Sequence, residues 1–217
     1  MNVTDAVNRR KSIRNFLPNP VTNDTLAELL TKAARAPSGG NLQPWRVFVV
    51  NGTRMADLQT FLASAEGQKQ PAYQIYPDNL KSPYRDSRFK VGEDMYALLG
   101  IPREDKPARF AHLARNYEFF GAPAAFFCFV DKQMGPPQWS DLGMFLQTFM
   151  LLAQEAGLDT CAQEAWAMRS EAVAQFVGAD EDLMLFCGMA IGEADPNSQV
   201  NTLVSDREEL SVWATFV

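Results

Sequence analysis

The feature that most constrains the fold is an unbroken apolar run at residues 124–130, Ala-Ala-Phe-Phe-Cys-Phe-Val. An apolar run without polar alternation is typical of a strand that is covered on both faces. We therefore expect residues 124–130 to form a central strand. Helical and strand patterns alternate along the rest of the chain at irregular intervals, and this arrangement predicts an α+β fold.

Hydrophobic spacing and capping residues predict the remaining elements, and no internal repeat or linker divides residues 1–217, which we interpret as a single domain. The predicted helices are residues 4–11 (N-cap Thr4), 22–35 (N-cap Thr22), 52–65, patterns around 95–99 and 110–117, 140–157 (N-cap Ser140, stopped at Gly157) and 169–178; the predicted strands are 46–50, 124–130, a short strand after Gly157, and 183–191.

Residues 66–88 have no steady hydrophobic period and are rich in Gln, Pro, Tyr, Asn, Lys and Arg. Segments of this length without regular structure are often lids or binding loops. We interpret this segment as an irregular excursion, and residues 66–120 as the region that covers a substrate. Tyr73, Tyr76 and Tyr84 are the expected lid residues, because flat rings select flat aromatic ligands by stacking.

The tail at residues 193–217 also lacks a period, yet it carries several apolar side chains. Apolar side chains on an extended segment need a surface on which to bury. That surface belongs either to the body of the same chain or to a second subunit. The apolar residues of the tail are Leu203, Val204, Leu210, Trp213, Phe216 and Val217.

Composition excludes several classes of protein. The net charge of the chain is −6, and its one compact basic cluster is at residues 9–14. This charge distribution argues against a nucleic-acid-binding protein. No apolar run reaches about 18 residues, and the N-terminus has no secretory apolar region, so neither a membrane span nor a signal peptide is expected. Three cysteines do not form a disulfide framework, which favours a reducing cytoplasm, with Cys128 and Cys187 as buried thiols.

Two polar segments are candidates for binding a ligand. Residues 37–45, Pro-Ser-Gly-Gly-Asn-Leu-Gln-Pro-Trp, are either a helix-stopping loop or a loop whose backbone approaches a ligand. Arg10, Ser12 and Arg14 lie two residues apart and share one face if the segment is extended. Guanidinium groups bind phosphate in bidentate fashion, so this face is either an anion site or a solvated basic patch.

Together the two segments resemble the FMN-dependent nitroreductase family, which has Arg-x-Ser-x-Arg-x-Phe near the N-terminus and then Pro-Ser-x-x-Asn-x-Gln-Pro-Trp. Both patterns are complete here, at residues 10–16 and 37–45. The resemblance continues through nearly the whole chain, in residues 141–143, 157–161, Gly192, Asp195, Asn201 and Arg207. It implies a mostly antiparallel central sheet flanked by helices, in an intertwined homodimer that exchanges C-terminal arms.

The resemblance also implies how FMN binds. Arg10, Ser12 and Arg207 correspond to residues that hold the phosphate, and Arg14 lies near the pyrimidine edge, where a cation stabilises reduced flavin. Residues 37–41 correspond to a loop that reaches the flavin of the other subunit, and the backbone N–H of Glu164 points at flavin N5. The cofactor-binding residues implied in this way are Arg10, Lys11, Ser12, Arg14, Pro37, Ser38, Gly39, Asn41, Gln43, Gln163, Glu164 and Arg207.

The expected activity follows from the same resemblance. NADH or NADPH reduces the flavin, which then reduces a nitroaromatic, a quinone or a similar small aromatic acceptor by two-electron, ping-pong transfer. Protons can come from water, so no catalytic side chain and no metal ligand is expected. Cys161 and the single histidine, His112, are interpreted as structural because no Cys–His pair is indicated. The alternatives are a dehalogenase or dehydrogenase of the same fold, and a flavin-binding dimer without turnover that acts as a carrier or sensor.

Overall fold

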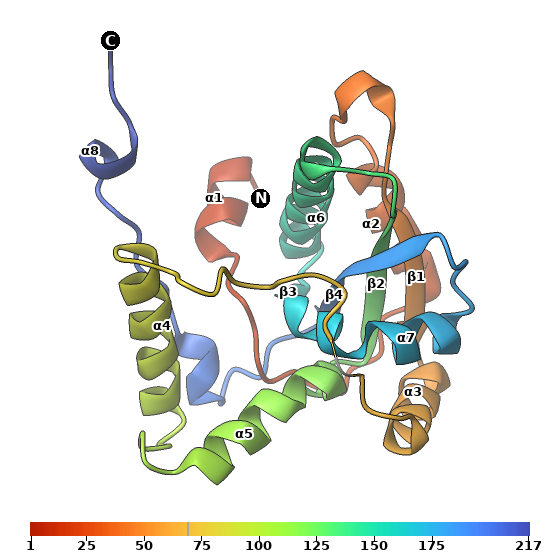
Figure 1. The fold of residues 1–217 in the computed structure, drawn as a ribbon, viewed down its shortest axis with the longest axis horizontal. Helices are drawn as coiled ribbons and strands as arrows, with labels where there is room; N and C mark the ends of the chain where they lie inside the picture. Colours follow the sequence, from red (N-terminus) through yellow and green to blue (C-terminus); the bar gives the residue numbers. More distant parts are fainter. Residues whose placement is uncertain (69) are drawn as a thin grey trace.

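A four-stranded sheet forms the centre of the protein in a computed structural model that describes residues 1–68 and 70–217 (Figure 1). The strand order is β1–β2–β4–β3, and all neighbouring strands are antiparallel. The apolar run predicted as a central strand is β2, an inner strand with every residue buried except Asp131. The α+β class and the mostly antiparallel sheet are therefore confirmed. The strands are β1 (Arg46–Asn51), β2 (Ala124–Asp131), β3 (Asp159–Gln163) and β4 (Leu183–Gly192).

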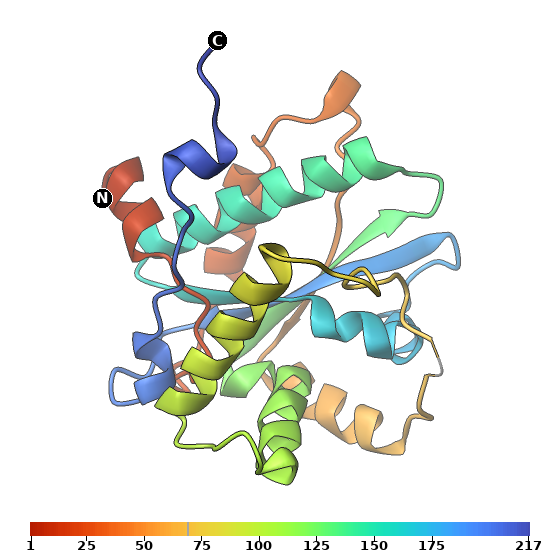
Figure 2. The ribbon, with the colours of Figure 1, turned by 60° about the vertical axis from the view of Figure 1, so that its left-hand side comes forward.

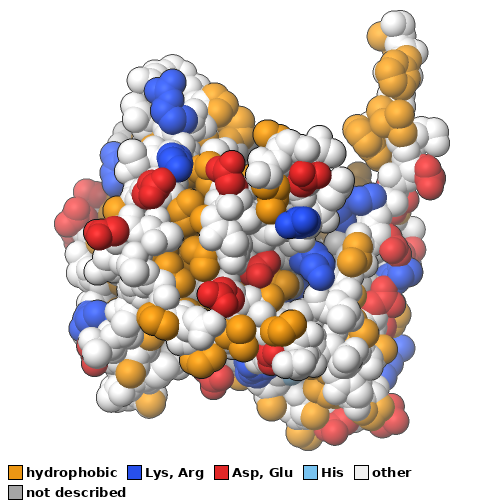
Figure 3. Space-filling model, turned by 180° about the vertical axis from the view of Figure 1, so that it is seen from behind, with side chains coloured by type: hydrophobic (Ala, Val, Ile, Leu, Met, Phe, Trp, Pro, Cys, Tyr) orange, Lys and Arg blue, Asp and Glu red, His pale blue; other side chains and the backbone are white. Residues whose placement is uncertain are grey.

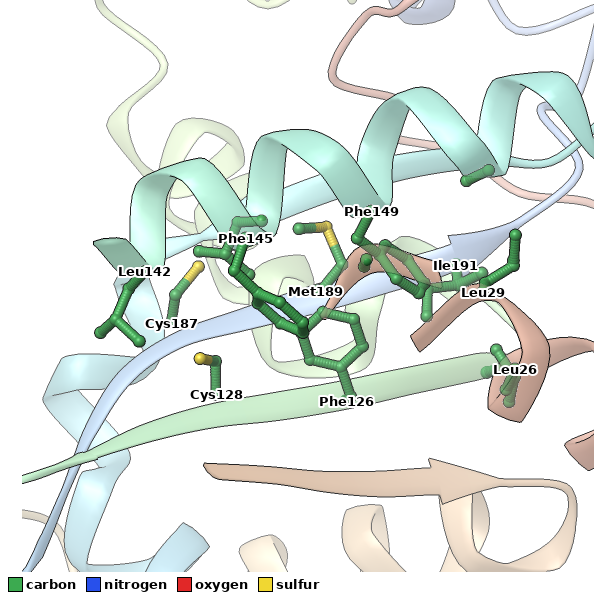
Figure 4. Close-up of a cluster of buried hydrophobic side chains, with 14 of the residues drawn as sticks. Leu26, Leu29, Phe126, Cys128, Leu142, Phe145, Phe149, Cys187, Met189 and Ile191 are labelled. Carbon is green, nitrogen blue, oxygen red and sulfur yellow. The ribbon is translucent and has the colours of Figure 1, made fainter. Parts of the chain in front are cut away.

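Helices cover both faces of the sheet. On one face, α2 (Asn23–Ala33) and α6 (Pro136–Glu155) bury a cluster in which the rings of Phe126 and Phe149 meet edge to face at 4.9 Å (Figure 4). On the other face, an aromatic cluster around Trp166 is enclosed by short helices and 3₁₀ turns. The elements of that second layer are α3 (Thr53–Ser64), α7 (Ser170–Val177), η2 (Arg115–Gly121) and η3 (Glu164–Arg169).

The remaining elements lie around this three-layer body (Figure 2). Helix α1 (Val3–Arg9) packs beside α6, α4 (Tyr84–Leu98) beside η4 (Gln199–Thr202), and α5 (Lys106–Ala114) beside η2. A 3₁₀ turn, η1 (Gly39–Asn41), precedes β1, and α8 (Leu210–Trp213) lies in the tail. Within the described residues, no helix combines the length and the apolar character that crossing a bilayer requires.

Two predicted helix starts are wrong. The first helix begins at Val3 because Asn2 caps it and exchanges hydrogen bonds with Asp5, so Thr4 lies inside the helix. Helix α6 begins at Pro136, as is common for proline in the first turn, and the Gln138 side chain accepts a hydrogen bond from the Gly135 N–H. Ser140 is therefore not a cap.

The excursion at residues 66–88 is shorter than predicted, because α4 begins at Tyr84. Tyr73 is not at a free lid surface, since its ring packs against Trp139 and Phe186 and its hydroxyl donates to the carbonyl of Phe186. Lys69, which falls in the predicted excursion, lies outside the described residues. The assignment of residues 66–120 as a lid remains a prediction.

The tail leaves the body, as Figure 3 shows by its orange side chains on a projecting arm. The arm, residues 208–217, carries Leu210, Val212 and Trp213 at its short helix, and Phe216 near its end is 88% exposed. Exposing large apolar side chains to water is unfavourable, and a group of them usually marks a surface that contacts a partner. The body of the same chain thus does not provide the surface that we predict the tail needs.

Candidate functional site

The segment that follows α1 lies beside the outer edge of β3. Ser12 forms a parallel bridge with Thr160, and the Ile13 N–H donates to the Thr160 carbonyl at 3.0 Å. Ile13 is buried, whereas its neighbours Ser12 and Arg14 are half-buried on the opposite side. The extended backbone predicted for this segment is therefore present, and it turns alternate side chains away from the core.

Asn201 fixes this segment from the tail. Its side-chain oxygen accepts from the Arg14 N–H at 2.9 Å, and its amide donates to the Asn15 carbonyl at 2.7 Å. The Lys11 ammonium donates to the Asn201 carbonyl at 2.8 Å. Asn201 is only 6% exposed, so its buried side-chain oxygen and amide are both paired, the oxygen with the Arg14 N–H and the amide with the Asn15 carbonyl. The two ends of the chain are thereby joined at one place.

A cavity of about 520 Å³ opens at this junction. It brings together five of the predicted site residues, Arg10, Lys11, Ser12, Arg14 and Arg207. Four of these carry positive charge, and among the described residues no Asp or Glu lines the cavity, although the whole chain has a net charge of −6. Such a surplus of unpaired cations around a hydroxyl is a site for an anion.

Sequence reasoning missed Gln147, which lines the same cavity from α6. It lies between the core residues Leu146 and Phe149, and the helical spacing of those residues shows that position 147 points away from the sheet. Its role depends on α1 packing beside α6, and no local pattern reveals that contact. Its amide adds a neutral donor and acceptor to a wall that is otherwise cationic.

Arg207 reaches the cavity from the tail. Its guanidinium donates to the Ser205 hydroxyl at 2.8 Å and to the Asp206 carbonyl at 2.8 Å, which folds the side chain back on its own turn. The same turn is linked to α4 by an ion pair between Lys90 and Asp206 at 2.8 Å. Both members of that pair are exposed, so the link contributes little stability.

The second predicted group, residues 37–45, is not part of this cavity. None of Pro37, Ser38, Gly39, Asn41 and Gln43 lines it. These residues form a loop over the N-terminal half of α6, whereas α1 lies beside the opposite half (Figure 2). Within one chain, the two predicted halves of the site are therefore separate.

The end of β3 supplies a third group. Exposed Ala162 and Glu164 alternate with buried Cys161 and Gln163 where β3 passes into η3. The Glu164 side chain is exposed, and partial burial of its carboxyl raises its pKa. Gln163 points the other way, since its buried amide donates to the Asn116 carbonyl at 2.9 Å.

Two reactive residue types close to this site are buried. Burial raises the pKa of the Cys161 thiol, and the nearby Arg14 and Arg10 offset only part of that effect. Burial and the charges of Arg115 and Arg14 lower the pKa of His112 to about 4. Burial thus favours the neutral thiol and the neutral imidazole, and the interpretation of both residues as structural stays a prediction.

Comparison with known proteins completes the description. Residues 7–193 match the model of the Nitroreductase family. The 4-nitrobenzoate reductase of Pseudomonas putida is 35% identical over 96% of this chain and 92% of its own length. The nitrobenzene nitroreductase of Ectopseudomonas oleovorans is 32% identical over 99% of this chain and 96% of its own length.

Solved structures give the same result. The crystal structure described as the FMN and NADPH-dependent nitroreductase NfnB from Sphigopyxis sp. strain HMH has a TM-score of 0.96 and 44% identity, and covers 100% of this chain and 99% of that one. The FMN-dependent NfnB of Mycobacterium smegmatis, solved in complex with NADPH, has a TM-score of 0.89 and 27% identity, with both chains fully covered. The chain therefore belongs to the nitroreductase family.

Proposed function

We propose that the protein is an FMN-dependent oxidoreductase that uses NADH or NADPH to reduce nitroaromatic compounds and similar small aromatic acceptors. The observation that carries this proposal is the cation-lined cavity built from Arg10, Ser12, Arg14 and Arg207, in which Ser12 belongs to the segment that bridges the outer edge of β3. The relatives named as nitroreductases, and the solved neighbours named as FMN- and NADPH-dependent, support the same chemistry.

The residues of the cavity fit the phosphate end of FMN. Two guanidinium groups, from Arg10 and Arg207, and the Ser12 hydroxyl are the donor types that bind a phosphate dianion. The described residues that line the cavity include no carboxylate to repel the phosphate, and the cavity volume of about 520 Å³ exceeds what a phosphate alone requires. Arg14, which lies two residues beyond Ser12, would stabilise negative charge on the reduced ring system and so raise its reduction potential.

The edge of β3 fits the reactive part of the ring. When bound, FMN supplies the chemistry of the reaction by accepting and passing on a hydride. In this proposal the chain contributes the backbone N–H of Glu164, an exposed residue directly after β3, as a donor to a ring nitrogen, and Arg14, which supplies charge. Neither residue exchanges a proton in this proposal, so protons are taken from water.

The separation of the two half-sites supports a homodimer. The loop at residues 37–43 does not line the cavity of its own chain, and in this proposal the loop of a second copy completes it. The exposed apolar arm supplies the means of association, because it carries side chains that the body of its own chain does not cover. We include the exchange of these arms between the two subunits in the proposal.

Substrate and location complete the proposal. Tyr76 and Tyr84 remain the candidates for the wall that stacks on an aromatic acceptor, and the guanidinium of Arg88 lies 3.9 Å from the centre of the Tyr76 ring. The three cysteines are free thiols, as is usual in a reducing cytoplasm. A cytoplasmic dimer that acts on a small aromatic molecule is consistent with each of these features.

An absorbance experiment tests the function directly. The purified protein is mixed with FMN, freed of excess flavin, and titrated anaerobically with NADH and, separately, with NADPH. We expect flavin bands that bleach with at least one nicotinamide and return on addition of 4-nitrobenzoate or a quinone. Bands that persist with both nicotinamides would indicate a flavin carrier, and a colourless protein would refute the assignment of the cavity.

A further inference from the structure

The loop at residues 37–45 is held in a strained shape. Gly40 has φ of 57°, and two residues that are not glycine, Asn41 and Gln43, have φ of 59° and 50°. A left-handed conformation costs roughly 1–2 kcal/mol for each such residue. Backbone of this kind persists only where surrounding contacts determine it, and such loops are common at ligand sites.

Most hydrogen bonds of the loop are internal and do not fix its place on the body. The Gln43 N–H donates to the Ser38 hydroxyl at 3.0 Å, and the Gln43 amide donates to the Asn41 carbonyl at 3.2 Å. Among the described residues, one hydrogen bond joins the loop to a distant element. The Gly39 N–H donates to the carboxylate of Asp141 on α6 at 3.2 Å.

Asp141 is an unusual residue for its position. It is 4% exposed and precedes the core residues Leu142 and Phe145 on α6. Burying a carboxylate is costly unless it is hydrogen-bonded, and an apolar residue would suit the packing of this face better. The Trp45 ring stacks on Phe145 with centroids 4.9 Å apart, so two anchors of the loop lie one helical turn apart on α6.

We propose that Asp141 is a positioning residue of the flavin site: it holds Gly39 and Asn41 in the shape in which they contact the cofactor bound mainly by the partner subunit. This inference rests on the proposed function, because it assigns the loop to a site for FMN. Asp141 acts through the Gly39 N–H and does not contact the cofactor. Its acceptor oxygen is the property that matters, since that atom receives the hydrogen bond.

Three variants distinguish the loss of the Asp141 acceptor oxygen from a general loss of protein stability. Asp141→Ala removes the acceptor, whereas Asp141→Asn keeps an oxygen in the same place. Gln154→Ala is the matched control, because Gln154 is also a buried polar residue of α6 but lies at its other end and binds the Leu158 carbonyl. FMN binding is measured by titration at a temperature where each variant is folded, as checked by urea unfolding.

We expect Asp141→Ala to raise the dissociation constant of FMN at least ten-fold. Asp141→Asn and Gln154→Ala should stay within about three-fold of the unaltered protein. If Asp141→Ala does not fold, Asp141→Val, which fills more of the space without accepting a hydrogen bond, takes its place. Equal affinity for the acceptor-free variant and the control would overturn the proposal, as would an equal loss in the Asn variant.

A mixed dimer tests whether Asp141 serves the site of the partner. Chains with Arg10→Ala and with Asp141→Ala, each carrying a different affinity tag, are co-expressed and purified through both tags. One site of this dimer combines both defects, and the other combines neither, so half of the sites should bind FMN with unaltered affinity. Two weak sites would show that Asp141 acts on its own chain. An unaltered protein that binds no FMN would instead refute the proposed function.

Discussion

Single side chains create the charge of the cavity and keep its cations in place. Arg10, Lys11, Arg14 and Arg207 repel one another, and none of them is balanced by a lining carboxylate. Asn201 holds this segment in place, because its side chain binds the backbone of Arg14 and Asn15 and its backbone carbonyl accepts a hydrogen bond from the Lys11 ammonium. The cavity is thus held ready for an anion before any anion arrives, which lowers the cost of binding one.

The neighbouring arginines 9 and 10 give a matched test of this site. Arg9 is exposed in the last turn of α1 and does not line the cavity, whereas Arg10 does. A hydrogen bond to a charged group is worth about 1.5–3 kcal/mol, so Arg10→Ala should weaken FMN binding by roughly 10- to 100-fold. Arg9→Ala should leave it within about two-fold at physiological salt. Equal effects of the two changes would mean that only the net charge matters.

His112 makes the stability of the protein depend on pH. Its imidazole lies between the rings of Tyr96 and Phe120, and Arg14 and Arg115 face it. Its pKa in the folded protein is about 4, below the usual 6.5, so the unfolded chain binds the proton more tightly. The stability from neutral His112 is complete above pH 6.5 and falls as the pH drops toward 4.

Urea unfolding at pH 7.5 and pH 5.0 measures this effect. The histidine should cost about 2 kcal/mol of the free energy of unfolding between these two pH values. His112→Leu removes the titrating group. Between pH 7.5 and pH 5.0 the free energy of unfolding of this variant should therefore fall by about 2 kcal/mol less than that of the unaltered protein. A variant that shows the same loss as the unaltered protein would mean that other groups cause it.

At the level of elements, the position of Glu164, the first residue of η3, depends on how η3 packs on the sheet. Trp166 of η3 is fully buried, and its ring lies 4.7 Å from that of Phe119 and 4.9 Å from that of Phe127. Gly188 of β4 lies directly beneath it. A methyl group at position 188 would come within 2.3 Å of the Trp166 ring, a distance that real contacts do not show.

Gly188→Ala should therefore displace η3. The ring is enclosed on several sides and cannot move away, so we expect a loss of about 1–3 kcal/mol in the free energy of unfolding, together with weaker FMN binding. Gly92→Ala in α4 is the control, because a methyl group there meets no atom within 4 Å and alanine favours the helix. If urea unfolding shows Gly188→Ala to be as stable as this control, the packing argument is wrong.

The elements also show which features a sequence can predict. Arg10, Ser12 and Arg14 were predictable because their spacing along one extended segment is local. The start of α4 at Tyr84 was missed because Pro83 and the polar residues before it obscure the first turn of the helix. Gln147 and Asp141 were also missed as site residues, since their roles depend on contacts with α1 and with a loop about 100 residues away.

At the scale of the whole molecule, the main feature is the C-terminal arm, whose apolar side chains the body of the chain does not cover. The sequence predicted that the tail needs a surface, because apolar residues on a segment without period have no other explanation. It did not reveal that the body leaves the arm uncovered, since that depends on where η4 and α4 direct the chain after residue 202. The arm also begins beside Arg207, so association and the cofactor site share one segment.

Removal of residues 210–217 tests this link. The truncated chain keeps Arg207 and Asn201 and loses the exposed Leu210, Val212, Trp213 and Phe216. If the arm joins two copies, sedimentation should show a shift from dimer to monomer. FMN affinity should fall at least ten-fold, because the loop at residues 37–43 of the partner no longer reaches the cavity.

A substitution within the arm serves as the control. Thr215→Ala changes a residue of the same segment without removing an apolar side chain, so it should keep both the dimer and the affinity. Because affinity depends on the dimer in this argument, the truncated protein should regain FMN binding at protein concentrations high enough to restore association. A truncated protein that stays dimeric, or a monomer that binds FMN as well as the full chain, would separate the arm from the site.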